Sequence, residues 1–119
     1  MGHSQCGAVK AAINSEIENE EDCPSNVGKI VKKVRPAVRA VTNALGRNPK
    51  SMEFNELLHL STIENVRRSA NLITHKSPVL QELVKRKKLG VVSALYDLHT
   101  GQVDFELPEL EVFNQKGVS

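Results

Sequence analysis

A histidine and a cysteine near the start of the chain are the residues whose types and spacing best fit metal chemistry. His3 and Cys6 lie three positions apart in the segment Gly-His-Ser-Gln-Cys-Gly-Ala-Val. Neutral imidazole and thiolate are favoured ligands of zinc, at about 2.0–2.3 Å from the metal. Gly2 and Gly7 flank the pair and allow the tight backbone turn that would aim both side chains at one point. The spacing alone also fits a histidine and a cysteine that lie near a disordered terminus and bind no common metal ion.

A helix is predicted directly after this pair. Residues 7–14 have high helical propensity and contain no breaker after Gly7. Cys6 would then precede a helix N-terminus, where the partial positive charge of the backbone suits a metal-binding thiolate. The acidic residues 15–26 are typical of a solvated loop. Cys23 in this loop leaves three interpretations open: a third ligand of an unrelated zinc site, a partner of Cys6, or an exposed cysteine without a role.

Composition limits the class of protein but does not indicate a chemistry. The 119 residues suffice for one domain, and with three Phe, one Tyr and no Trp the core must be aliphatic. A net charge of +2 with 25% charged residues predicts no particular partner. No apolar run reaches the ~18 residues of a membrane span, and no signal peptide is expected. Two cysteines fit a reducing compartment, so we expect a cytoplasmic protein, or an organellar one, with no membrane or nucleic-acid partner.

Two long amphipathic helices are predicted in the middle of the chain. Residues 27–45 carry an aliphatic stripe at helical spacing, and Pro36 predicts a kink or a restart near Arg35. The opposite face is basic and lacks interleaved aromatic residues, so it is expected to be solvated; it comprises Lys29, Lys32, Lys33, Arg35 and Arg39. A second helix is expected over residues 52–75, with a core face of Leu57, Leu60, Ile63, Val66, Ala70 and Ile73. Its isolated histidines, His59 and His75, are expected to be exposed or partly buried and not to bind a metal.

The last third of the chain predicts a short helix and two strands. Ser77 and Pro78 are typical of a helix start, and the following helix should bury Val79, Leu80, Leu83 and Val84 and end in the basic residues 85–88. Residues 89–98 form a continuous apolar run that favours a strand buried on both faces of a parallel sheet. Residues 103–107 alternate as an edge strand does, and Pro108 should end the pairing.

Several of these segments resemble the β-class carbonic anhydrases, in the same order along the chain. Residues 2–12 resemble that family's second metal-ligand segment. The other similar segments are the Pro-Ala-Val helix of residues 30–38, the Asn-Val within the 52–75 helix, and residues 89–105. The resemblance implies an α/β fold with a parallel sheet, here mostly helical with one buried strand and an antiparallel edge strand. It also implies that His3 and Cys6 are two of the three protein ligands of a catalytic Zn2+, and that the reaction is the reversible hydration of carbon dioxide to bicarbonate.

The resemblance covers the C-terminal half of the family's domain. The family's upstream Cys-x-Asp-Ser-Arg segment, which supplies the third protein ligand, has no counterpart here. We therefore expect a truncated form, with a partial carbonic anhydrase domain over residues 1–108 and a tail over 109–119. Zinc affinity should be weak, and the unpaired strand should favour a homo-oligomer. The alternatives are a non-catalytic zinc-binding or oligomerising remnant of that fold and a helical interaction module with basic faces.

Overall fold

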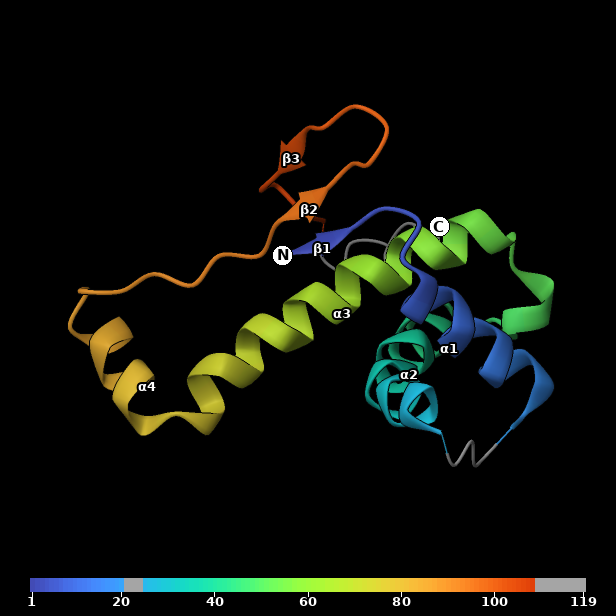
Figure 1. The fold of residues 1–119 in the computed structure, drawn as a ribbon, viewed down its shortest axis with the longest axis horizontal. Coiled ribbons are helices and arrows are strands. Elements are labelled where there is room, and N and C mark those ends of the chain that lie inside the picture. Colours follow the sequence, from blue (N-terminus) through green and yellow to red (C-terminus); the bar gives the residue numbers. More distant parts are fainter. Residues whose placement is uncertain (21–24, 109–119) are drawn as a thin grey trace.

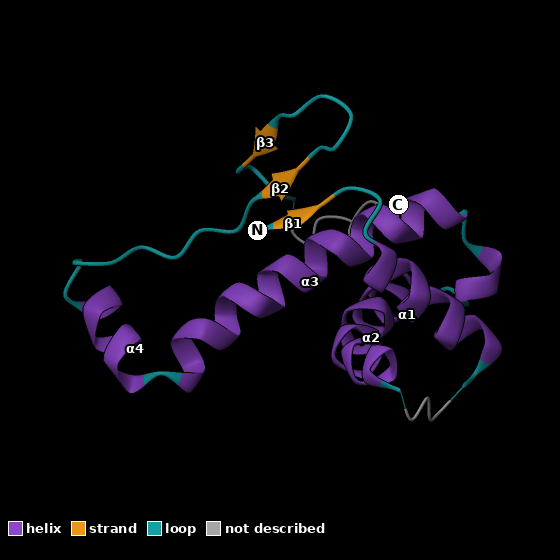
Figure 2. Cartoon of the chain, in the orientation of Figure 1, coloured by secondary structure: helices purple, strands orange, loops and turns teal. Residues whose placement is uncertain are grey.

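Helices make up most of the chain, and a small sheet lies beside the longest of them (Figures 1 and 2). The computed structural model describes residues 1–20 and 25–108. The helices are α1 (Gly7–Glu18), α2 (Asn26–Leu45), α3 (Phe54–Lys76) and α4 (Pro78–Lys85), with a 3-10 turn, η1, at Pro49–Ser51. The strands are β1 (Gly2–His3), β2 (Leu95–Tyr96) and β3 (Val103–Asp104). Within the described ranges, none of the helices combines the length and apolarity needed to cross a membrane.

The sheet has the order β1-β2-β3 and confirms the predicted mixture of directions. β1 runs parallel to β2, with Gly2 opposite Leu95 and His3 opposite Tyr96, and β3 runs antiparallel to β2. The strand predicted over residues 89–98 is regular at Leu95–Tyr96 alone, because only this part has strands on both sides to complete its hydrogen bonds. The earlier part of the run is not buried on both faces, since Val92 is 66% exposed.

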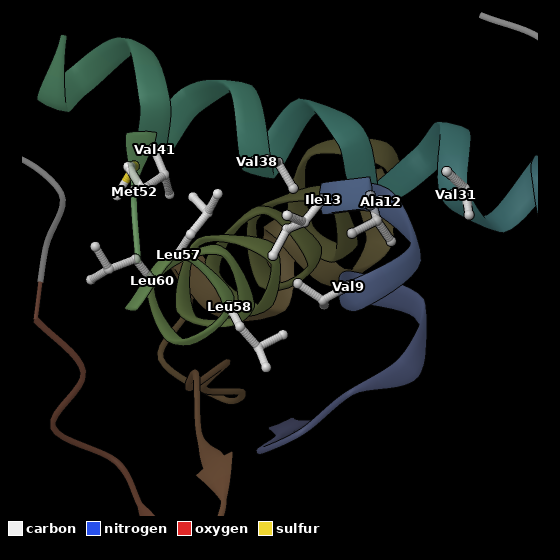
Figure 3. Packing of buried hydrophobic residues seen from close by; sticks show 11 residues of the cluster. Val9, Ala12, Ile13, Val31, Val38, Val41, Met52, Leu57, Leu58 and Leu60 are labelled. Atoms are coloured by element: carbon white, nitrogen blue, oxygen red, sulfur yellow. The ribbon is translucent and has the colours of Figure 1, made fainter. Parts of the chain in front are cut away.

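The hydrophobic core lies where α1, α2 and α3 meet. Its buried residues are mainly valine and leucine, as the composition predicts, and Figure 3 shows them converging from the three helices. The core includes Val9, Ala12, Ile13, Val31, Val34, Val38, Val41, Met52, Leu57, Leu58 and Leu60. Burial of such aliphatic side chains contributes roughly 1.5–3 kcal/mol each, so this cluster is the main source of stability.

The predicted loop over residues 15–26 is wrong in its first part, because α1 continues to Glu18. Ile17 packs against the core, which gives this extra turn a buried side. Asn19 then ends the helix in the left-handed conformation, with φ 55°. Cys23 lies outside the described residues.

α2 runs through Pro36 without the predicted restart near Arg35. Ser25 caps its start by accepting a hydrogen bond from the Gly28 N–H at 3.2 Å. Gly46 closes it with φ 61°, a conformation that glycine adopts without strain. Proline is tolerated here because the packing of the apolar side of α2 holds the helix on both sides of it.

The predicted solvated basic face of α2 is wrong at Arg35, which is 8% exposed. Its Nε donates to Glu16 Oε1 at 2.7 Å, and its Nη1 donates to the Glu20 carbonyl oxygen at 2.7 Å. Arg39 Nε donates to the same Glu16 oxygen at 2.9 Å. These charge-assisted bonds join the end of α1 to the middle of α2.

α4 begins as predicted but does not bury its apolar side. Ser77 accepts a hydrogen bond from the Leu80 N–H at 3.3 Å, and Pro78 is the first helical residue. None of the residues of α4 is buried, and Val79 is 71% exposed. Ile73 on α3, which was predicted in the core, is also exposed. In Figure 1 this end of α3 extends beyond α1 and α2, so those helices do not cover it.

Replacing the partly buried carboxylate of Glu16 should destabilise the fold. Glu16→Gln leaves the Arg35 guanidinium buried without a counter-charge, so we expect a loss of about 3 kcal/mol in the free energy of unfolding by urea. Glu18→Gln makes the same chemical change at an exposed position of the same helix and should have little effect. Equal losses in the two variants would show that the ion pair does not stabilise the fold.

Candidate metal centre

His3 and Cys6 lie at the two ends of the turn that joins β1 to α1. His3 is the last residue of β1, and Cys6 is the residue that precedes the first turn of α1. Gln5 between them has φ 56°, a left-handed conformation that turns the backbone sharply. The structure thus places both predicted ligands on one short connection between a strand and a helix.

Hydrogen bonds to β2 hold this turn in place. The Gly2 N–H donates to the Ala94 carbonyl oxygen at 3.0 Å, and the Ser4 N–H donates to the Tyr96 carbonyl oxygen at 2.8 Å. The Ser4 hydroxyl also accepts a hydrogen bond from the Leu98 N–H at 2.9 Å. The strand therefore fixes the backbone on both sides of His3.

The His3 ring is oriented by its own neighbour. Its Nδ1 lies 2.8 Å from the Ser4 carbonyl oxygen, and the side chain is exposed. A carbonyl oxygen can only accept, so this contact requires the hydrogen on Nδ1 and, in the neutral ring, places the lone pair on Nε2. A backbone carbonyl on the second ring nitrogen is the usual support of a metal-binding histidine. The neutral ring would therefore present Nε2 to a metal.

Cys6 is a half-buried free thiol at the start of α1. Its side chain packs against the hydrophobic core and forms no capping hydrogen bond with the helix. The sulfur is thus not committed to a backbone N–H. Imidazole nitrogen and cysteine sulfur together are a donor set that fits zinc.

Within the described ranges, no third ligand joins this pair. No group of three or more His, Cys, Asp and Glu residues there could hold a metal ion. His59 lines a small pocket with Ser4 and Gln5 but completes no such group. His75 is exposed, and its Nδ1 contacts the Asn71 carbonyl oxygen at 2.8 Å. Both histidines lie on the surface, as predicted. A catalytic zinc has three protein ligands, so two residues leave the site incomplete.

The predicted role of Gly2 and Gly7 in the tight turn is wrong, because Gln5 makes that turn; Gly2 has another role, and Ser4 has one that the sequence did not assign. A Cβ atom on Gly2 would collide with the Val66 methyl group on α3, so only glycine lets β1 lie this close to the helix. Gly7, in contrast, has open space around it. The spacing of the motif gives no sign of the Ser4 contacts with Tyr96 and Leu98, because these partners lie more than ninety positions away in the chain.

The known proteins that this chain resembles are carbonic anhydrases. A family model described as carbonic anhydrase matches residues 1–103. A solved structure, that of the beta-carbonic anhydrase CcaA, is similar with a TM-score of 0.63 and 19% sequence identity. The match covers 91% of this chain and 49% of that one, so this chain spans about half the length of CcaA. The search of curated proteins found no match.

The close approach of β1 to α3 can be tested by adding one methyl group. Gly2→Ala should cost about 1–3 kcal/mol in the free energy of unfolding, because valine is stiff and cannot move its methyl group away cheaply. Gly7→Ala should be neutral or stabilising by up to about 1 kcal/mol. With Val66→Ala already present, Gly2→Ala should cost much less, so the double-mutant cycle should give a large coupling energy between the two positions. Purely additive losses would contradict the contact.

Proposed function

The chain belongs to the carbonic anhydrase family, and on that premise we propose that His3 and Cys6 are two ligands of a zinc site for the reversible hydration of carbon dioxide to bicarbonate. One observation carries the proposal: the Ser4 carbonyl oxygen lies 2.8 Å from Nδ1 of His3 and so leaves Nε2 as the ring nitrogen for a metal, at the turn that also carries Cys6.

Each residue of the turn has a distinct task in such a site. Zinc, when bound, would activate water as the nucleophile that attacks carbon dioxide. His3 and Cys6 would hold the ion, and the hydrogen bonds of Ser4 to the His3 ring and to the backbone after β2 would keep the imidazole in one orientation. Gly2 allows the strand that carries His3 to pack on α3. A fixed donor geometry matters because a loosely held ligand weakens both metal affinity and the positioning of the reactants.

The remaining ligands would come from outside the described residues. Two ligands are fewer than zinc catalysis requires, and the described ranges supply no third. The family's Cys-x-Asp-Ser-Arg segment is the natural source of the missing cysteine. The incomplete ligand set also favours a second candidate, a zinc-binding module of this fold without catalysis.

Zinc binding tests the ligand assignment directly. Each of His3→Ala and Cys6→Ser should weaken zinc affinity by at least about tenfold. Loss of a residue that only hydrogen-bonds to a metal ligand already has an effect of this size, and loss of the ligand itself should have a larger one. The measurement is a competition titration against a chromophoric chelator. His75→Ala is the matched control, because it removes an exposed histidine on α3 and should leave affinity unchanged. Equal affinities for the wild-type chain and both ligand variants would contradict the assignment.

A carbon dioxide hydration assay distinguishes the catalytic function from that of a non-catalytic zinc-binding module. The 119-residue chain should hydrate carbon dioxide no faster than buffer in a stopped-flow assay, because its described residues supply fewer ligands than a catalytic zinc needs. A fusion that places the N-terminal half of a β-class carbonic anhydrase before Met1 should show zinc-dependent hydration, and His3→Ala in that fusion should abolish it. A folded, zinc-loaded fusion without activity would favour the non-catalytic module.

A further inference from the structure

Large apolar side chains are exposed where α4 follows α3, over residues 72–92, which we call the α4 end. They are Leu72 and Ile73 on α3, Val79 and Val84 on α4, and Leu89 and Val92 in the segment after α4. Val79 is 71% exposed, and none of the residues of α4 is buried. Monomeric proteins seldom leave large apolar patches in water, so the α4 end is a candidate interaction surface.

The α4 end also concentrates positive charge. Its cations are Lys76, Lys85, Arg86, Lys87 and Lys88, and its one carboxylate is that of Glu82. These five cations and one carboxylate give it a net charge of +4, whereas the whole chain has +2, so the remaining residues together are negative. Glu82 is paired with Arg86 at 3.0 Å, and the four lysines have no ion-pair partner within the described ranges. Such an uneven distribution of charge is typical of proteins that bind a polyanion or an anionic surface.

The turn that closes α4 holds the cations next to the exposed apolar side chains. Lys87 has φ 58°, and its N–H donates to the Val84 carbonyl oxygen at 3.0 Å. The Lys88 N–H donates to the Leu83 carbonyl oxygen at 2.9 Å. Cations at a helix C-terminus also suit the helix dipole, but that effect is confined to the last turn and gives no reason for valines to be exposed there. The charge and the apolar side chains therefore call for one explanation.

We propose that the α4 end binds the surface of an anionic lipid bilayer. Lysines attract the acidic headgroups, and apolar side chains on the same helix enter the boundary between headgroups and acyl chains. Nucleic acid fits less well, because the α4 end exposes aliphatic side chains and has no aromatic one to stack on a base. In Figure 1 α4 lies at the end of the molecule farthest from α1 and α2, so a flat surface can reach it without meeting these helices. We expected no membrane partner because no segment is long enough to span, but surface binding needs no span.

Co-sedimentation of the full, zinc-free chain with lipid vesicles tests the proposal. The chain should bind vesicles of phosphatidylcholine with about 30% phosphatidylglycerol, and bind phosphatidylcholine alone at least about tenfold more weakly. Lys87→Gln/Lys88→Gln should weaken binding to the anionic vesicles by about thirtyfold, because each lysine near such a surface contributes about fivefold. Raising NaCl from about 0.1 to about 1 M should also weaken it, because the Debye length falls from about 10 to about 3 Å. Val79→Ser should weaken binding by about tenfold, because it removes apolar area from the bilayer contact.

Matched controls make the same changes on α2. Lys32→Gln/Lys33→Gln removes two exposed charges, and Val27→Ser shortens a side chain that is 61% exposed; neither should change vesicle binding appreciably. Circular dichroism shows whether each variant is folded. Binding equal to that of the wild-type chain in either folded α4 variant overturns the proposal. Absence of wild-type binding to the anionic vesicles also overturns it and assigns the α4 end to an acidic protein partner. Since no zinc is present, the outcome is separate from the proposed carbonic anhydrase chemistry.

Discussion

The close packing of β1 against α3 is the constraint on which the rest of the structure depends. α3 is the longest helix and contacts both α1 and α2 and the strand β1 (Figure 1). It therefore fixes the position of the sheet relative to the core helices. Gly2 lets the strand backbone reach Val66 without a side chain between them. Because His3 follows directly, the distance between strand and helix also determines where the candidate metal ligand lies.

The position of Cys6 depends on a second interaction, at the opposite end of α1. The buried pair of Arg35 and Glu16 joins that end of α1 to α2, while Val9, Ala12 and Ile13 pack its middle into the core. A helix held along its length has a fixed start, and Cys6 lies at that start. The two candidate ligands are thus positioned by different parts of the fold, His3 by the sheet and Cys6 by the helical core.

Local patterns in the sequence predicted the helices and strands well, but predicted less well which of their side chains are buried. The Ser77-Pro78 helix start, the long helix α3 and the antiparallel edge strand are confirmed, because each follows from residues adjacent in the chain. The burial of Arg35 was missed, although this residue lies four positions after Val31 and three before Val38, on the apolar stripe itself. Burial of α4 was predicted from its periodicity, but periodicity shows which side is apolar and not whether anything covers it. The family resemblance gave the identity of the candidate ligands. The hydrogen bonds that hold Ser4 to Tyr96 and Leu98 could not be predicted, because they join distant segments of the chain.

In the proposed site, the His3 imidazole and the Cys6 thiolate bind one and the same metal ion. X-ray absorption at the zinc edge of the metal-loaded chain can detect both ligands. Sulfur is expected at about 2.3 Å and imidazole nitrogen at about 2.0 Å from zinc. The sulfur signal should vanish in Cys6→Ser but persist in Cys23→Ser, and the imidazole signal should vanish in His3→Ala. A zinc ion surrounded by oxygen and nitrogen alone, or a sulfur signal unchanged by Cys6→Ser, would contradict the claim.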